Sequence, residues 1–289
     1  MRSEREMLDL VLDVAKQDER VRAVIMNGSR ANLNAQRDLF QDFDIVYLVT
    51  DVAPFKRNRE WIRSFGEIMI LQTPDDMREP PPSEDAGYAY LMQFTDGNRI
   101  DLSIHPIARL DEVSRDSLSV LLLDKDNAIE PFPPPSERDY LPTPPSAKQY
   151  ADCCNEFWWV CPYVAKGLWR EQLTYAKFML DQVVRDELMK MLTWYIGVQT
   201  DFSRNLGGFG KFFQEYLEPE LWKQLQRTYA DASYDNMWEA LFVMCDLYRR
   251  VAVATAQRFG FEYPHGEDSR VSAHLELVRR LPRDATAVH

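Results

Sequence analysis

The chain has 289 residues, with 34 Lys and Arg against 46 Asp and Glu, so its formal net charge is −12. This acidity excludes a protein that holds nucleic-acid phosphates on a basic surface. Hydrophobic residues make up 45% of the chain, enough for a sizeable core, and this excludes wholesale disorder. The length fits one large domain or two ordinary ones.

The sequence shows neither an export signal nor a membrane segment. Its N-terminal segment is charged throughout, and no apolar run approaches the roughly 18 residues of a membrane span. The cysteines have no spacing typical of a disulfide framework or a zinc site, so we interpret them as reduced core thiols. They are Cys153, Cys154, Cys161 and Cys245. We therefore expect a cytoplasmic protein without a membrane partner.

The first half of the chain mixes helical and strand patterns. Residues 3–18 carry apolar side chains at helical spacing behind a Ser3/Glu6 capping pair, and residues 55–65 predict a second helix. Short apolar or alternating segments between turn residues predict strands. The predicted strands are 22–29, 42–49, 67–72, 88–94 and 99–105.

The second half of the chain has long helical patterns and few strand signals. The segment 131–145 holds seven prolines in fifteen residues, which favours extended backbone and marks a domain boundary. Helices are predicted over 148–167, 169–195 and 236–259, the last closed by Gly260. Pro162 should kink or end the first of these.

These patterns together predict an α+β protein of two domains. Residues 1–135 would form a domain with a mixed sheet flanked by helices, and residues 136–289 a helical bundle. Negative charge is concentrated in the first half, since residues 1–145 hold 17 basic and 27 acidic side chains. An acidic domain of this kind suits divalent metals and cationic substrates.

Three aspartates lie where a strand disfavours them. Asp42 and Asp44 share one face of the second predicted strand, and Asp101 lies on a later strand between residues that favour burial. Two carboxylates at positions i and i+2, with a third from a neighbouring strand, form an oxygen-rich cluster suited to Mg²⁺. Because Mg²⁺ is commonly bound by one or two carboxylates together with substrate phosphates, the cluster predicts phosphate chemistry.

A Gly-Ser pair ends the strand before the aspartates. Gly28 lets backbone approach a phosphate closely, and the Ser29 hydroxyl can donate to its oxygens. A lone Gly-Ser carries almost no information. Followed by Asp-x-Asp on the next strand and a third Asp on a later one, it becomes a specific pattern.

At these residues the sequence resembles the nucleotidyltransferase superfamily that includes DNA polymerase β, and more closely the aminoglycoside 6-adenylyltransferases, also called streptomycin adenylyltransferases. The resemblance covers nearly the whole chain. It rests on NGSRAN (27–32), DFDIVYLVTD (42–51), GNRIDLSI (97–104), DCCNEFWWV (152–160), YVAKGLWR (163–170), MLTWYIG (191–197) and FGFEYP (259–264).

The resemblance implies an antibiotic-resistance enzyme that transfers AMP from ATP to a hydroxyl of streptomycin and releases pyrophosphate. The first domain would then be the nucleotidyltransferase domain and the second would bind the acceptor. Asp42, Asp44 and Asp101 would be the catalytic and metal-binding residues for two Mg²⁺ ions, while Gly28 and Ser29 would seat the triphosphate. The partners would be ATP and a cationic aminoglycoside, with no nucleic acid and no membrane, and the chain would be a monomer or a weak homo-oligomer.

Several assignments stay open at this stage. Arg30 and Lys211 are candidate nucleotide-binding residues, since either offers a basic group to triphosphate oxygens. The general base is Asp101 or, as weaker alternatives, Glu67 or Asp96. His105 ends the Asp101 strand on the same face and is more typical of a hydrogen-bonded residue than of a catalytic one. The tryptophans Trp158, Trp159, Trp169 and Trp194 fit a core as well as a drug site.

Two other functions fit the same residues. The first is a nucleotidyltransferase of this fold that acts on another hydroxylated metabolite or on a protein. The Cys161-Pro162 pair departs from the family pattern next to the predicted acceptor helix and leaves the acceptor open. The second is a non-catalytic nucleotide-binding relative, against which the presence of all three aspartates argues.

Overall fold

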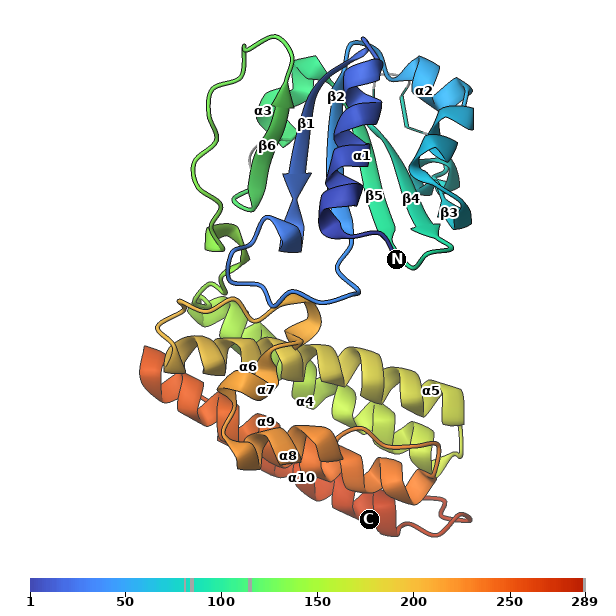
Figure 1. Ribbon diagram of the computed structural model, residues 1–289. Coiled ribbons are helices and arrows are strands. Elements are labelled where there is room, and N and C mark those ends of the chain that lie inside the picture. The colour runs from blue at the N-terminus through green and yellow to red at the C-terminus, as the bar shows by residue number, and fades with distance from the viewer. Residues whose placement is uncertain (81, 84–85, 114–115, 288–289) are drawn as a thin grey trace. The chain divides into compact units, whose positions relative to one another are not determined.

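The computed structural model describes residues 1–80, 82–83, 86–113 and 116–287 (Figure 1). The chain divides into two compact units, Met1–Asp139 and Tyr140–His289, and the division falls inside the proline-rich segment 131–145. The first unit contains a sheet with helices, and the second is helical. This architecture confirms the predicted α+β class.

The first unit is built on a six-stranded sheet of order β3-β4-β5-β2-β1-β6. The parallel pair β2 and β5 lies at its centre, and the other neighbours are antiparallel, so the sheet is mixed as predicted. The strands are β1 (Val21–Asn27), β2 (Phe43–Val49), β3 (Ile68–Gln72), β4 (Tyr88–Phe94), β5 (Arg99–Pro106) and β6 (Ser119–Asp124).

Alternation along β2 divides its side chains between the two faces of the sheet. Phe43, Ile45, Tyr47 and Val49 pack under α1 (Glu4–Gln17), which crosses this face in Figure 1. The Tyr47 hydroxyl donates to the carbonyl oxygen of Val11 in that helix at 2.5 Å. The opposite face buries Val46 and Leu48 against the segment that includes η4 (Ile107–Arg109) and α3 (Leu110–Val113). Asp44 belongs to this second face, and its position on the strand is therefore fixed by two apolar layers.

The first unit differs from the predicted elements in several places, among them the short helix α3, which was not predicted. The predicted helix 55–65 is a short α2 (Ala53–Arg57) followed by the 3₁₀ helix η2 (Glu60–Phe65), because the chain is extended at Asn58. Strand β6, at the sheet edge beside β1, was not predicted. Two further 3₁₀ segments, η3 (Pro74–Met77) and η5 (Arg138–Tyr140), lie in connections.

The second unit is a bundle of helices around an aromatic and aliphatic core. At its centre the rings of Phe157 and Tyr248 stack with centroids 3.6 Å apart. Ser146 caps the first helix through a capping box with Gln149. Its helices are α4 (Ala147–Trp169), α5 (Leu173–Phe178), the π-helical segment η6 (Met179–Val184), α6 (Arg185–Gln199), α7 (Phe213–Tyr216), α8 (Pro219–Arg227), α9 (Tyr234–Phe259) and α10 (His265–Arg280), with the 3₁₀ turn η7 (Gly208–Gly210).

The bundle refines the predicted helices. Helix α4 does not end at Pro162 but continues to Trp169, and the predicted helix 169–195 is replaced by α5, η6 and α6 after a turn at residues 170–172. Helix α9 ends as predicted with Gly260 in the left-handed conformation. Helices α8 and α10 were not predicted.

The four cysteines agree with the sequence prediction. Cys153, Cys154, Cys161 and Cys245 are free and buried in the helical core, so they are core thiols. Within the described part of the chain, no helix combines the length and the apolar character needed to cross a membrane.

Candidate active site

The three predicted aspartates meet at one end of the central strand pair. Asp44 on β2 is in register with Asp101 on the parallel neighbour β5, and Asp42 lies just before β2. One carboxylate oxygen of each lies within 4.8 Å of the others, and all three residues are half-buried. The sequence prediction that these carboxylates converge is therefore correct in geometry.

The cluster carries more negative charge than its surroundings stabilise. Burial, and then the negative charges of Asp42 and Asp101, raise the pKa of Asp44 to about 7. A carboxyl that resists ionisation in this way is stabilised by a bound cation, and oxygen-only donors select a hard divalent ion such as Mg²⁺. The donor set therefore fits the predicted metal.

Arg99 lies against the carboxylates and offsets part of their charge. Its Nε and Nη2 donate to Oδ1 and Oδ2 of Asp101 at 2.7 and 2.6 Å, and its Nε lies 3.9 Å from Oδ2 of Asp42. These bonds raise the pKa of the Arg99 guanidinium above its ordinary value. Because a guanidinium fork on both oxygens of Asp101 uses atoms that a metal would need, Arg99 and a metal ion would compete for Asp101.

The predicted Gly-Ser pair lies directly beside the cluster. Gly28 and Ser29 begin the 3₁₀ helix η1 (Gly28–Arg30), and the preceding Asn27 on β1 is in register with Asp44. Gly28 has φ of +72°, and a Cβ on it would lie 2.2 Å from Oδ2 of Asp44. Glycine is required here both for the left-handed backbone and for the close approach of the carboxylate.

Comparison with known proteins bears on the whole chain. A family model described as streptomycin adenylyltransferase matches residues 1–278. The chain belongs to the streptomycin adenylyltransferase family. It is thereby a nucleotidyltransferase enzyme, and the resemblance stated from the sequence is confirmed.

The match to relatives extends over almost the whole length of both chains. The chain is 41% identical over 266 residues to the aminoglycoside 6-adenylyltransferase of Bacillus subtilis (strain 168), covering 91% of this chain and 94% of the relative. It is 43% identical over 265 residues to that of Campylobacter jejuni, covering 91% and 92%. A crystal structure of an aminoglycoside 6-adenyltransferase from Bacillus subtilis is 36% identical, covers 97% of this chain and 100% of that chain, and superposes with a TM-score of 0.48.

The two basic residues predicted to bind nucleotide have different surroundings. Arg30 turns its guanidinium into the first unit, toward backbone carbonyls at residues 41 and 42. Lys211 belongs to the second unit, where it follows η7 with an exposed side chain and its Nζ lies 5.0 Å from the centroid of the Phe212 ring. A nucleotide contact by Lys211 stays a prediction.

The weaker sequence candidates have structural partners of their own. Asp96 accepts hydrogen bonds from Arg2, which hold the pKa of its carboxyl well below the usual range, and Glu67 accepts a hydrogen bond from Thr95 at 3.2 Å. The His105 ring is half-buried against Gly87, and burial lowers the pKa of its imidazole. The carboxylates of Asp96 and Glu67 are thus hydrogen-bonded to residues of their own unit.

Sequence reasoning missed two residues near the cluster because it missed β6. Ser119 begins that strand and donates from Oγ to Oδ1 of Asn27 at 2.8 Å, next to Asp44 in the register. Asp116, just before β6, adds to the rise in the pKa of Asp44. A continuous apolar run at residues 120–123 is the signal that would have found this strand.

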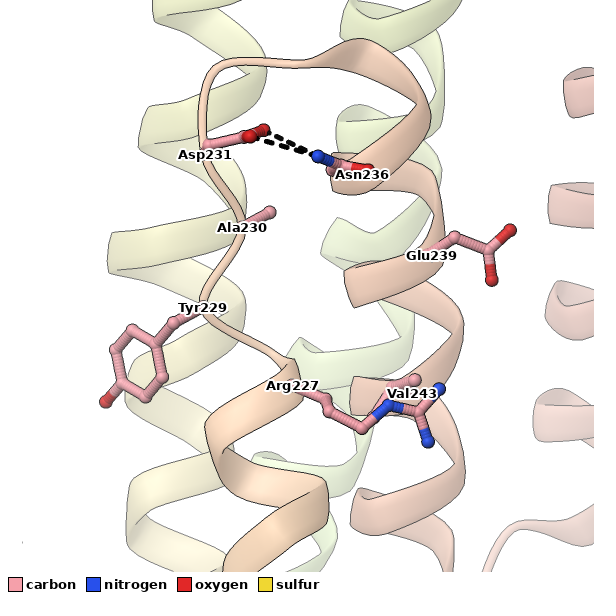
Figure 2. Close-up of a pocket in the computed structure, with 7 residues that line it drawn as sticks. All are labelled: Arg227, Tyr229, Ala230, Asp231, Asn236, Glu239 and Val243. Atoms are coloured by element: carbon pink, nitrogen blue, oxygen red, sulfur yellow. Dashed lines mark hydrogen bonds between the residues drawn. The ribbon is translucent and has the colours of Figure 1, made fainter.

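The second unit has a surface pocket of its own, about 390 Å³ in volume (Figure 2). The Asp231 carboxylate is held there by the Asn236 amide at 3.0 Å, shown by the dashed lines, and Glu239 accepts a hydrogen bond from Arg279. The two carboxylates are thus used in contacts within the bundle. The pocket is lined by Arg227, Tyr229, Ala230, Asp231, Asn236, Glu239 and Val243.

Proposed function

We propose that this enzyme transfers AMP from ATP to a hydroxyl of an aminoglycoside, with streptomycin as the acceptor, in a Mg²⁺-dependent reaction that releases pyrophosphate. The proposal is supported by the family model and by relatives named aminoglycoside 6-adenylyltransferase. Such a reaction uses ATP and places the enzyme in the cytoplasm, where ATP is available.

The convergence of Asp42, Asp44 and Asp101 is the observation that carries the proposal. These carboxylates would hold two Mg²⁺ ions, which when bound neutralise charge on the triphosphate and on the leaving pyrophosphate. The raised pKa of Asp44 supports the proposal, because a bound cation would stabilise its ionised carboxylate. Asp101, in register with Asp44, is the residue we propose to accept the proton of the attacking hydroxyl.

The Gly-Ser turn would seat the triphosphate beside these carboxylates. Gly28 has no side chain to separate the backbone of η1 from Asp44, so a phosphate held on the carboxylate side lies within reach of the Ser29 hydroxyl. Lys211 remains a candidate second contact. The excess of acidic side chains in residues 1–145 favours a cationic acceptor over a neutral one.

The experiment is pyrophosphate release by the purified protein with Mg²⁺-ATP and a panel of aminoglycosides. Asp44→Asn serves as the blank, and Asp9→Asn, which changes an exposed carboxylate on α1, is the matched control. We expect release with streptomycin in the wild type and in Asp9→Asn, and a rate lower by orders of magnitude in Asp44→Asn.

Other results would change the proposal in defined ways. Mg²⁺-dependent ATP binding with no release across the panel would replace the acceptor by another hydroxylated metabolite or a protein. Loss of both ATP binding and release would make the chain a non-catalytic relative. Equal rates in Asp44→Asn and the wild type would contradict the metal assignment.

A further inference from the structure

Arg30 is a buried arginine next to the proposed metal site. Its side chain is 8% exposed, and Nη1 lies 3.3 Å from Oε2 of Glu4. Nε donates to the carbonyl oxygen of Asp42 at 2.9 Å, and Nη2 donates to that of Gln41 at 2.7 Å. The guanidinium carbon lies 3.7 Å from the centroid of the Phe43 ring. One side chain thus contacts three consecutive residues at the start of β2, two through their backbone carbonyls and the third through its ring.

The contacts from Arg30 hold a part of the chain that is not hydrogen-bonded into the sheet. Strand β2 and its register with β5 begin at Phe43, so Asp42 lies outside the strand ladder. The chain before it, residues 31–42, forms turns and irregular backbone, and the side chains of Leu33 and Phe40 are 83% and 90% exposed. The contacts from Arg30 therefore anchor the last part of an otherwise exposed segment at the point where it supplies a carboxylate to the cluster.

The contacts also require arginine. A guanidinium presents several N–H donors in a rigid plane, so it can donate to two adjacent carbonyls while it stacks on an aromatic ring. A lysine keeps the charge toward Glu4 but loses this geometry. With Nε, Nη1 and Nη2 directed to groups of its own unit, Arg30 is built into the first unit.

We propose that Arg30 is a positioning residue that fixes the backbone of residues 41 and 42 against the Phe43 ring and thereby holds Asp42 in place to bind metal with Asp44 and Asp101. This inference rests on the proposed function, because it assumes that the cluster binds divalent metal. In this proposal Arg30 acts by positioning a carboxylate and does not contact the triphosphate.

The direction in which metal affinity changes when Arg30 is replaced distinguishes the positioning role from other roles of this residue. Arg30 is close enough to Asp42 for their charges to interact. Removing a cation near the carboxylates strengthens metal binding if charge alone matters. Positioning predicts the opposite, weaker metal binding, because Asp42 loses its fixed place. A triphosphate ligand predicts a higher KM for ATP and no change in metal binding without nucleotide.

The test is a Mn²⁺ titration of the nucleotide-free protein, with free Mn²⁺ measured by electron paramagnetic resonance. Arg30→Lys and Arg30→Met are compared with Arg20→Lys, a matched control in which an arginine stacked on Phe55 lies at the other end of β1. We expect about 10- to 100-fold weaker Mn²⁺ binding in both Arg30 variants, and binding within about twofold of wild type in Arg20→Lys.

A second variant and a kinetic measurement guard against misfolding. Phe43→Leu keeps the charge of Arg30 and removes its stacking surface, and we expect it to weaken Mn²⁺ binding by a smaller factor in the same direction. Thermal unfolding identifies any variant that is not folded at the titration temperature. If the Arg30 variants are unfolded, the Mn²⁺ affinity of Phe43→Leu decides whether Arg30 positions Asp42. In the enzyme assay, Arg30→Lys should lower kcat and leave KM for ATP within about threefold of wild type.

The possible results separate this inference from the proposed function. If the wild type binds Mn²⁺ and the folded Arg30 variants bind it equally well or more tightly, the positioning role is overturned and the proposed function stays intact. A raised KM for ATP with unchanged Mn²⁺ binding would make Arg30 a triphosphate ligand. A wild-type protein that binds no Mn²⁺ and catalyses no Mg²⁺-dependent transfer would refute the metal assignment, and the positioning role with it.

Discussion

The backbone of Gly28 lies so close to Asp44 that a Cβ atom on residue 28 would be 2.2 Å from the Oδ2 atom of that aspartate. The turn after β1 and the carboxylate on β2 therefore occupy one shared space. Any side chain at residue 28 must displace the proposed metal ligand or the turn itself.

Gly28→Ala tests this close approach, with Gly260→Ala as the matched control. Both glycines have φ near +70°, but a Cβ on Gly260 meets no atom within 4 Å. Gly260→Ala should cost about 1–2 kcal/mol of stability from backbone strain alone and keep wild-type activity. Gly28→Ala should in addition lower kcat by about 100-fold, because Asp44 is displaced. Thermal unfolding and steady-state rates measure both effects. Equal activity in the two variants would contradict the prediction that a side chain at residue 28 displaces Asp44.

The raised pKa of Asp44 predicts how stability depends on pH in the absence of metal. Burial and the charges of Asp42 and Asp101 raise this pKa from 3.8 to about 7, so the folded protein holds the Asp44 proton more tightly than the unfolded chain. The contribution of Asp44 to the free energy of unfolding is therefore present below pH 4 and is lost as the pH rises to about 7.

Asp44→Asn lacks this contribution and should become more stable relative to wild type across that window, by up to about 1.4 kcal/mol per pH unit. Calorimetry in chelator between pH 5 and 8 measures the difference, with Asp9→Asn as the control that should follow the wild type. Adding Mg²⁺ at pH 8 should raise the Tm of the wild type more than that of Asp44→Asn. A constant difference between the two proteins over this pH range would show that Asp44 is not perturbed.

The sequence predicted the carboxylate cluster because local patterns determine it. Alternation along β2 sets the face of Asp44, and the parallel register between β2 and β5 then brings Asp101 beside it. Asp42 lies just before the strand, so alternation alone does not place it. Edge strand β6 was missed because it is a short apolar run without alternation. Helix α10 was missed because it is largely polar and buries few apolar residues, Leu275 and Val278 among them.

The place of Arg30 illustrates what local pattern cannot predict. Its position directly after Gly28-Ser29 favours a phosphate contact, and nothing nearby in the sequence indicates otherwise. Its partners at residues 41 and 42 are brought to it by the irregular segment 31–42, whose path no periodicity encodes. A phosphate contact by Arg30 stays an untested prediction, whereas the predicted helix at 55–65 is wrong in that it is interrupted at Asn58, whose extended backbone the apolar spacing does not indicate.

Arg99→Met tests competition between this guanidinium and a metal ion. Arg99 donates to both carboxylate oxygens of Asp101, so its removal frees oxygens that a metal ion would bind under the proposed function. We expect Mn²⁺ binding about two- to fivefold tighter, since exposed ion pairs contribute up to about 1 kcal/mol. Arg109→Met, which breaks an exposed pair with Glu112 in the same unit, should leave Mn²⁺ binding unchanged. Weaker binding in Arg99→Met would mean that Arg99 orients Asp101 for the metal instead of competing with it.

A buried ion pair anchors α10 to α9 in the second unit and gives a prediction on stability. Asp268 is 4% exposed and accepts two hydrogen bonds from Arg249 at 2.6 and 2.7 Å and one from the Tyr263 hydroxyl at 2.8 Å. The same arginine also pairs with Asp246, whose side chain is 67% exposed. Arg249 is 35% exposed and keeps Asp246 as a partner when Asp268 loses its charge. Because Asp268→Asn turns the charge-assisted hydrogen bonds of a buried carboxylate into neutral ones, it should cost about 1.5–3 kcal/mol.

Asp246→Asn is the internal control for that measurement, since it changes the exposed partner of the same Arg249. It should cost less than about 1 kcal/mol. Urea unfolding followed by tryptophan fluorescence measures both, because the guanidinium of Arg249 lies 5.7 Å from the ring of Trp158. Similar losses in the two variants would show that burial does not set the strength of this pair, and that α10 is held to α9 by its apolar contacts alone.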